Sequence, residues 1–464
     1  MPNATTALDA ALAYADAHLE ESLGRLTEIV RIKSISTDPA YKAEVQRAAD
    51  WVVAELETQG FEASARATPG HPVVIGHNLA GNGPHVVFYA HYDVQPVDPL
   101  ELWNTDPFEP TLVKQPDGET HIVARGTSDD KGQLLTFLEA CRAWKATAGS
   151  LPLKVTVLSE GEEETGGKSL PAVLEAARAE LDADIALICG TDLWTRQTPA
   201  IVAMLRGLVG EEIEITCASH DLHSGMYGNT ARNPIQVLAD IIASLRNPDG
   251  SVAIEGFYDD VKELPAEIAD LWKRLPYDEA AFLANAGLSS SAGEQGRTVL
   301  EQTRARPTCE INGITGGYTG EGFKTVIPAK ASAKISFRLV SEMDPVKIRA
   351  AFRKHVQDRL PPDATVTFAE HGGSPAVTVP HDGPLLRKAA AALQDEWGNE
   401  TAIIGSGGSI PVAGQFKSIL GLDTLLIGFA LGDDRIHSPN EKYNLSSFHK
   451  GIRSWIRILA ALAD

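Results

Sequence analysis

Short apolar runs alternate with helix-like segments over the first two hundred residues, and this alternation constrains the fold more than any other feature. Runs at 86–90 (VVFYA), 153–158 (LKVTVL) and 185–189 (IALIC) are mostly apolar, as strands are when both faces of their sheet are covered. Helix-like patterns precede or separate these runs, at 43–58, 133–146 and 169–180. The alternation predicts βαβ units, and therefore an α/β fold with a mostly parallel sheet flanked by helices.

The pattern changes after about residue 207. Segments at 211–216 (EEIEIT) and 332–338 (SAKISFR) alternate polar and apolar residues, which indicates half-exposed antiparallel strands. The same part of the chain contains helix-like segments at 234–246 and 345–359, and an acidic stretch at 255–305. We expect the acidic stretch to be a long helical insertion within a smaller α+β domain.

The alternation of apolar runs and helix-like segments returns near residue 379. It includes a helix-like segment at 384–397, an apolar run at 424–430 (TLLIGFA) and an amphipathic segment at 446–462. We therefore predict one larger domain made of 1–206 and 379–464, interrupted by an inserted domain at 207–378.

Composition argues against several classes of partner. Lys and Arg number 41 against 62 Asp and Glu, for a formal charge of -21, which disfavours nucleic acid or an anionic membrane. No apolar stretch approaches the ~20 residues of a membrane span, and 1–23 resembles an amphipathic surface helix rather than a signal peptide. The four cysteines lack C-x-x-C spacing, which argues against a disulfide framework or a thiolate zinc site. We expect a cytoplasmic protein.

Asp, Glu and His residues lie in five separate segments at the ends of predicted strands. In an open α/β sheet, parallel strands end at the edge that binds ligands. The segments are HYDVQP (His91, Asp93), GTSDDKG (Asp129), SEGEEETGG (Glu162, Glu163, Glu164), CGTD (Asp192) and HSPNE (His437). Taken singly, His91 could be a structural histidine, and Asp129 or Asp130 could cap the helix that follows. Five such segments together indicate a common site.

The residue types of this common site suit a metal. Carboxylates and imidazoles without thiolates favour Zn, Mn or Co over a structural zinc knot. Many carboxylates brought together repel one another unless cations neutralise them. We therefore predict two divalent ions, with zinc the first choice and manganese or cobalt the alternatives.

These motifs resemble the M20 family of metallopeptidases over nearly the whole chain. The family includes cytosolic nonspecific dipeptidases, carnosine dipeptidases, glutamate carboxypeptidases, aminoacylases and succinyl-diaminopimelate desuccinylases. The resemblance rests on HYDVQP, GTSDDKG, EGEEETGG, CGTD, DLHSG, KTVIP, FRLV, GGSIP and HSPNE, in that order.

The resemblance implies a role for each residue of the common site. Asp129 would bridge two metal ions, with His91 and Asp192 completing one ion's ligands, and Glu164 and His437 those of the other. Asp93 would support His91. Glu163 would be the general base that takes a proton from the metal-bridging water. Glu162 has no implied role, so it either tunes the local field or faces solvent.

The resemblance also implies substrate contacts from the inserted domain, which would act as a lid and a dimer interface. His223 would reach the active site of a partner copy and stabilise the oxyanion. Thr325 and Arg338 would bind the substrate's C-terminal carboxylate, although Arg338 could instead face solvent. His220 matches no family role and reads as a structural histidine.

Residues 405–412 (GSGGSIPV) resemble the family's substrate loop, in which Ser409 would contact substrate. Gly405 and Ser406 stand where dipeptidase relatives often carry a charged pair. This departure leaves the substrate preference open.

Among the family's activities, HYDVQP, KTVIPAK and GGSIPV favour a homodimeric dipeptidase that hydrolyses small peptides. An N-acyl or N-carbamoyl amino acid hydrolase with the same metal chemistry is the alternative in the same class. A non-catalytic peptide or amino-acid binder is the alternative in another class, but such a binder has no need of Glu163.

Overall fold

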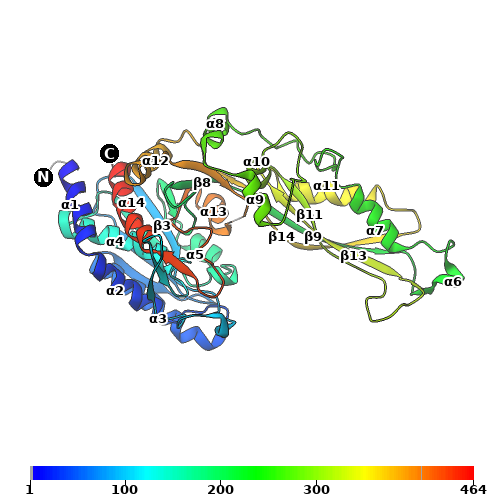
Figure 1. Cartoon of the computed structure of the whole chain (residues 1–464), viewed down its shortest axis with the longest axis horizontal. Helices are drawn as coiled ribbons and strands as arrows, with labels where there is room; N and C mark the ends of the chain where they lie inside the picture. The colour runs from blue at the N-terminus through cyan, green and yellow to red at the C-terminus, as the bar shows by residue number, and fades with distance from the viewer. Residues whose placement is uncertain (1–3, 409, 464) are drawn as a thin grey trace. The chain divides into compact units, whose positions relative to one another are not determined.

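The computed structural model describes residues 4–408 and 410–463, which form two compact units. The first unit contains the first and the last described segments of the chain, drawn in blue and red in Figure 1. It consists of Met1–Ala203, Val379–Ile404 and Pro411–Asp464, and the second of Met204–Thr378 and Gly405–Ile410.

A nine-stranded mixed sheet has most of its strands in the first unit. Its order is β1-β2-β6-β3-β7-β17-β8-β15, with β16 beside β8. The bounds are β1 (Glu62–Arg66), β2 (Val73–Asn78), β3 (His85–His91), β6 (Lys154–Glu160), β7 (Ile185–Ile188), β8 (Ala200–Leu205), β15 (Val377–Thr378), β16 (Ala402–Ser406) and β17 (Thr424–Ile427). The expected parallel arrangement holds for the four central strands β6, β3, β7 and β17, whereas β1, β2, β8 and β15 pair antiparallel. The carboxyl ends of the four central strands therefore meet at one edge.

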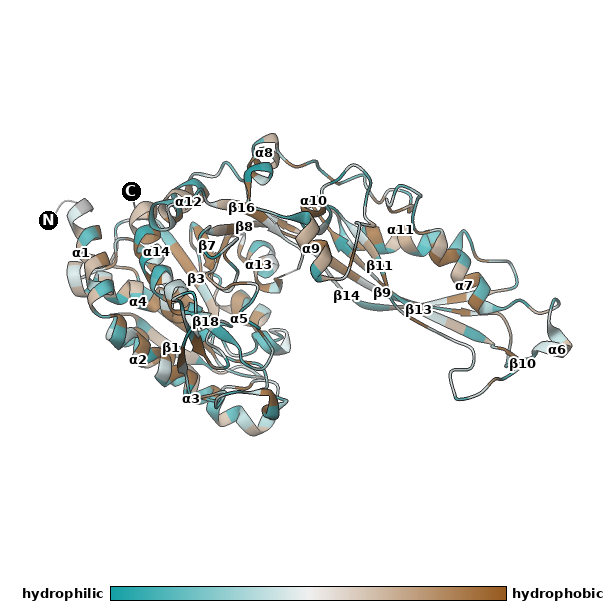
Figure 2. Cartoon of the chain, in the orientation of Figure 1, coloured by the Kyte–Doolittle hydropathy of each residue, from teal (hydrophilic) through white to brown (hydrophobic). Residues whose placement is uncertain are grey.

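Helices cover this sheet and fix the segments that carry the strand-end residues. They are α1 (Ala4–Ala17), α2 (Leu19–Val30), α3 (Lys42–Thr58), α4 (Lys131–Ala148), α5 (Leu170–Ala176), α12 (Pro384–Trp397), α13 (Pro411–Gln415) and α14 (Leu445–Ala463). Phe88 of β3 stacks on Phe137 of α4 with ring centroids 3.7 Å apart, and Trp455 of α14 meets both rings edge-on. This buried cluster holds the start of α4, directly after Asp130, against β3. Figure 2 shows hydrophobic residues gathered on β3 and β7.

A small three-stranded sheet also belongs to the first unit. It consists of β4 (Thr111–Lys114), β5 (Thr120–Val123) and β18 (Lys442–Asn444), in the order β18-β5-β4. Because β18 directly follows Glu441 and β5 leads into Arg125, the pairing of β18 with β5 brings two distant parts of the sequence together.

The second unit is built on an antiparallel sheet, as its alternating segments predict. The order is β11-β13-β9-β14, with bounds β9 (Gly207–Thr216), β11 (Thr308–Gly316), β13 (Lys330–Leu339) and β14 (Thr365–Ser374). Residues of β9 and β13 alternate between buried and partly exposed, which confirms the half-exposed interpretation. Helices α7 (Pro234–Ala243) and α11 (Pro345–Gln357) contact the sheet.

The prediction of one long helical stretch at 255–305 is wrong. The structure has three short helices there, α8 (Ala266–Arg274), α9 (Glu279–Asn285) and α10 (Val299–Arg304). Pro265, Pro276 and Gly287 interrupt the helical pattern. Within the described ranges, no helix is long and apolar enough to cross a membrane.

Candidate metal centre

The predicted strand-end residues converge at the carboxyl edge of the central strands. His91 ends β3 and lies in register with Glu160, which ends β6. Glu162, Glu163 and Glu164 follow β6 directly, and β7 runs parallel on the other side of β3. This edge is where an open α/β sheet binds ligands.

Asp129, Glu164 and His437 form the most compact group of candidate ligands among the described residues. Each offers one ligand atom, and these atoms lie within 4.8 Å of one another. His437 Nε2 lies 2.9 Å from Asp129 Oδ2 and 3.2 Å from Glu164 Oε2. Residues far apart in the sequence thus present two carboxylates and an imidazole to the same small volume.

The two carboxylate oxygens of Asp129 contact different imidazoles. Oδ2 faces His437, whereas Oδ1 lies 3.2 Å from His91 Nε2. Glu164 is on the His437 side. Asp129 therefore lies between two imidazoles and divides the centre into two halves.

Asp93 orients His91 from the buried side. Its Oδ1 lies 3.3 Å from His91 Nδ1, and its Oδ2 accepts a hydrogen bond of 3.1 Å from the backbone N–H of Glu164. Asp93 is fully buried. A carboxylate on the far nitrogen of an imidazole fixes the ring so that the other nitrogen is presented to a metal.

The pKa values reflect the crowding of these groups. The pKa of His437 is raised to about 10, because its ring hydrogen-bonds to Asp129 and Glu164. Burial acts to raise the pKa of Asp129, but the hydrogen bonds with His437 and His91 outweigh it and lower this pKa. The centre thus favours positive charge beside its carboxylates.

The donor set fits divalent cations. Glu164 Oε1 is buried without a hydrogen-bond partner in the described parts of the chain, although buried carboxylate oxygens normally have one. His437 is 53% exposed, so one side of the centre is accessible. Imidazole and carboxylate donors without thiolate suit zinc, manganese or cobalt.

Asp192 lies near the same edge but outside the compact group. It follows β7 and forms a bridge with Ala430, just beyond β17. Its side chain is exposed. Its assignment as a ligand beside His91 stays a prediction.

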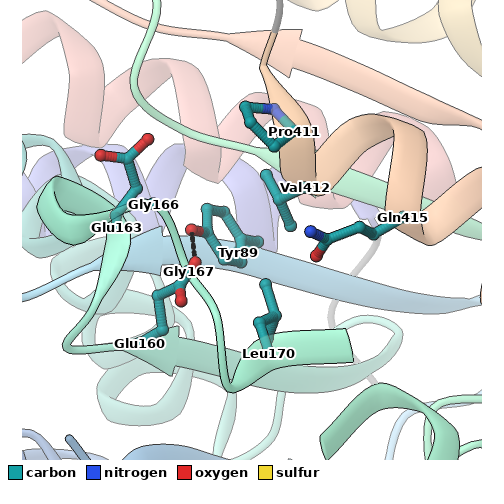
Figure 3. A pocket seen from close by; sticks show the side chains of 9 residues that line it. All are labelled: Tyr89, Glu160, Glu163, Gly166, Gly167, Leu170, Pro411, Val412 and Gln415. Carbon is teal, nitrogen blue, oxygen red and sulfur yellow. Dashed lines mark hydrogen bonds between the residues drawn. The ribbon is translucent and has the colours of Figure 1, made fainter. Parts of the chain in front are cut away.

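Glu163 begins a short 3-10 turn beside the metal candidates and lines a small pocket. Tyr89, Glu160 and Gln415 line the same pocket (Figure 3), and the Tyr89 hydroxyl donates to Glu160 Oε1. Burial, followed by the nearby Glu164, Asp93 and Asp129, raises the pKa of Glu163, although His91 opposes the shift. Burial likewise raises the pKa of Glu160 to about 8.

Glu162 does not face solvent, so that alternative is wrong. The side chain is 7% exposed and accepts hydrogen bonds from the backbone N–H groups of His71 at 3.0 Å and Ser169 at 3.1 Å. The three consecutive glutamates therefore differ in environment. Glu162 fastens the loop that carries Glu163 and Glu164.

Sequence analysis missed Glu441 and Gln95. Glu441 Oε1 accepts from the backbone N–H groups of Gly126, Ser128 and Asp129 at 3.0, 2.9 and 3.1 Å. Gln95 Nε2 donates to Glu164 Oε2 at 2.8 Å. Both residues lie inside the motifs HSPNE and HYDVQP, and that membership was the only available signal.

The predicted substrate residues of the second unit lie at two separate places. His223 ends β10 (Leu222–His223), which pairs with β12 (Val326–Ile327), and the Ser224 N–H donates to the Thr325 carbonyl at 3.1 Å. His223 and Thr325 are exposed there. Arg338 is near the far end of the ten-residue strand β13, which begins at Lys330. At about 3.3 Å per residue, β13 separates Arg338 from the His223 end by roughly 25 Å.

Three predicted residues remain, and the structure describes the surroundings of two of them, His220 and Arg338. His220 is exposed, and its ring contacts the neighbouring Ser219 hydroxyl at 2.9 Å. Arg338 is half-buried and lines a cavity, so it does not simply face solvent. Ser409 lies outside the described residues.

Comparison with known proteins places these features in one family. The sequence model of "Peptidase family M20/M25/M40" matches residues 87–461. The "Cys-Gly metallodipeptidase dug1" of Schizosaccharomyces pombe is 31% identical over 98% of this chain and 98% of its own length. The "Beta-Ala-His dipeptidase" of Homo sapiens is 28% identical over 98% of this chain and 93% of its own. The M20 family metallo-carboxypeptidase Sso-CP2 from Sulfolobus solfataricus superposes with a TM-score of 0.79 and 32% identity, covering 96% of this chain and 99% of that one.

Proposed function

The chain belongs to peptidase family M20/M25/M40, and from this membership we propose that it is a dipeptidase that holds two divalent cations around Asp129. The family and its metallopeptidase relatives make it a metal-dependent peptidase. The dipeptide preference rests on the two dipeptidase relatives, which match almost the whole chain.

The position of Asp129 between His91 and His437 is the observation that carries the two-ion proposal. One carboxylate oxygen faces each imidazole, so His91 with Asp192 would hold one ion, and Glu164 with His437 the other. Two such cations would polarise the scissile carbonyl and make a water acidic enough to attack at neutral pH.

Glu163 is the group best suited to move the proton. Because the pKa of Glu163 is raised, its carboxylate would accept a proton from the attacking water and then pass it to the leaving amine. Asp93 contacts both His91 and the backbone N–H of Glu164, so it would position these two metal ligands.

The separation of Thr325 and Arg338 supports a homodimer. Roughly 25 Å of β13 lies between them, so one dipeptide cannot contact both residues of the same chain. We infer that His223 and Thr325 of one copy serve the substrate held by Arg338 of the other. His223 would stabilise the oxyanion, and Arg338 would bind the terminal carboxylate. Ser409 stays a proposed substrate contact.

A substrate panel tests the activity. Metal-free protein is reconstituted with Zn²⁺, Mn²⁺ or Co²⁺ and given free dipeptides, tripeptides, and N-acetyl and N-carbamoyl amino acids. We expect dipeptide cleavage to dominate. Preferred release of the last residue from tripeptides would favour a carboxypeptidase, the activity named for the Sulfolobus relative. Deacylation without dipeptide cleavage would refute the dipeptidase assignment.

The free thiols support the cytoplasm as the proposed cellular setting. All four cysteines are free, which fits a reducing compartment such as the cytoplasm. Zinc is the first choice of metal, with manganese and cobalt as alternatives, because the same ligands accept all three.

A further inference from the structure

A cavity of about 600 Å³ lies within the second unit, between its short helices and the antiparallel sheet. Strands β11 and β13 contribute one wall through residues such as Glu310 and Arg338. Helices α9 and α10 contribute the other, through Phe282 and Gln302 among others, and Figure 1 shows both helices beside β11. Its volume is that of a site for a small organic ligand.

The lining of this cavity is positively charged, although the chain carries a formal charge of -21. Its charged residues are four arginines and two glutamates: Arg206, Arg246, Arg306, Arg338, Glu294 and Glu310. Arg246 pairs with Glu310 at 2.7 Å, and Arg306 with Glu294 at 2.7 Å. Both glutamates are therefore already neutralised by arginine.

Arg206 donates only to backbone carbonyl oxygens within the described part of the chain. Its Nε lies 2.9 Å from Gly407 O, and Nη1 lies 3.5 Å from Gln302 O and 3.4 Å from Arg306 O. Burial, followed by the nearby Arg338 and Arg304, lowers the pKa of Arg206 to about 10. A guanidinium held among other cations gains from an anion placed beside it.

Glycines 405 and 407 allow this cluster of cations to form. A Cβ at Gly405 would lie 2.7 Å from Arg304 O, and a Cβ at Gly407 would lie 2.9 Å from Thr303 O. Because both side chains are absent, the end of α10 approaches the loop closely, and Arg304 Nη1 donates to Gly405 O at 2.6 Å. Gly405 and Gly407 thus make room for the end of α10 and its Arg304 side chain.

Other parts of the same lining are apolar and accessible. Phe282 is 46% exposed and Leu288 is 53% exposed, and both line the cavity. Val299 adds a third apolar side chain. An apolar group bound there would remove this surface from water.

We propose that this cavity binds a small carboxylate that carries an apolar group, with Arg206 as an anion ligand and the Phe282 and Leu288 side chains as the apolar contact. The carboxylate has two possible sources. It belongs either to the C-terminal residue of a peptide, in which case the site rests on the proposed function, or to a separate acid that acts as an effector.

The test is calorimetric titration of the full-length holoenzyme with 3-phenylpropionate, and with 3-phenylpropanamide as the uncharged control. Because a carboxylate could also bind a metal ion, the titration is repeated on the His437→Ala variant. We expect 3-phenylpropionate to bind both proteins. We expect the amide to bind roughly tenfold more weakly or worse, since it cannot form the charge-assisted hydrogen bond.

Variants at two positions of the cavity, with one control, separate the site from general effects on folding. Arg206→Met should weaken binding roughly ten- to hundredfold, and Arg206→Lys should weaken it less because the charge remains. Leu288→Asp introduces repulsion at an exposed position and should also weaken binding. Leu112→Asp is its matched control, since Leu112 is 54% exposed and belongs to β4 of the other unit, and it should bind as the unaltered protein does.

The mode of inhibition then identifies the source of the carboxylate. If 3-phenylpropionate inhibits dipeptide cleavage competitively, and this inhibition is lost in Leu288→Asp, the cavity binds the C-terminal residue of the peptide substrate. If the inhibition is non-competitive and is lost in the same variant, the cavity binds a separate acid. Equal binding of propionate and amide, no binding to His437→Ala, or unchanged affinity in both Arg206→Met and Leu288→Asp would overturn the site. Failure of the chain to cleave dipeptides would leave these binding results intact.

Discussion

Replacing Glu441 by Ala tests how the protein holds Asp129 in place. Glu441 is fully buried, and its Oε1 accepts hydrogen bonds from three backbone N–H groups of the segment that ends in Asp129. Its Oε2 accepts from Arg125 Nη1 at 2.6 Å. Arg125 is 1% exposed, so removing the carboxylate leaves a buried cation without its acidic partner.

The structure sets the size of the expected effects. Breaking a buried ion pair from one side costs about 3–5 kcal/mol of unfolding free energy. Loss of the support behind a metal ligand weakens metal binding about 10- to 100-fold. Burial raises the pKa of Glu441 to about 7, although Arg125 opposes the shift, so a neutral side chain of the same shape is tolerated better. We therefore expect Glu441→Gln to cost only about 1–2 kcal/mol.

The assay combines denaturant unfolding at pH 8 with metal competition against a coloured chelator. Glu109→Ala is the matched control, because Glu109 is also paired with an arginine, Arg31, but both side chains are about half exposed. Exposed pairs contribute little, so metal affinity and stability should not change measurably in the control. Metal affinity in Glu441→Ala equal to that of the unaltered protein would refute this account of how Asp129 is positioned.

Three other predictions concern the catalytic segment, the dimer and a buried lysine. Glu163→Gln should keep its metal but lose about 10²- to 10⁴-fold in kcat. Glu162→Ala should lose about 2 kcal/mol of unfolding free energy, with a far smaller change in kcat. An equal loss of kcat in both variants would contradict the assigned roles. Mixing the inactive Glu163→Gln and His223→Ala proteins should restore roughly a quarter of the normal rate after random exchange of subunits, and no recovery would count against a shared site. Burial lowers the pKa of Lys131 to about 7. Between pH values of about 7 and 10 the unfolded chain therefore binds more protons, and the free energy of unfolding should rise with pH relative to Lys131→Met; parallel curves for the two proteins would contradict this.

Local patterns predicted the elements that position the centre. The apolar runs that became β3, β6 and β7 were identified because buried strands need apolar residues on both faces. The helix predicted at 384–397 is α12 (Pro384–Trp397), with Pro384 at its first position. Because His91 follows such a run directly, its place at the edge of the sheet could also be predicted.

Features that depend on distant contacts could not be predicted in the same way. Glu441 and Asp129 are joined only because β18 pairs with β5, and no periodicity in the sequence encodes that pairing. Glu162 has the same local sequence signal as Glu163 and Glu164, so only its contacts with His71 and Ser169 separate it from them. The cavity around Arg206 likewise depends on how the short helices fold onto the sheet.

The number of metal ions bound per chain tests the central claim most directly. Elemental analysis of the purified protein after metal loading and gel filtration should give two divalent ions for the unaltered chain. His91→Ala and His437→Ala should each retain about one, and Asp129→Ala should lose both, because Asp129 faces both imidazoles. One ion in the unaltered chain, or two ions retained by Asp129→Ala, would contradict a centre divided by Asp129.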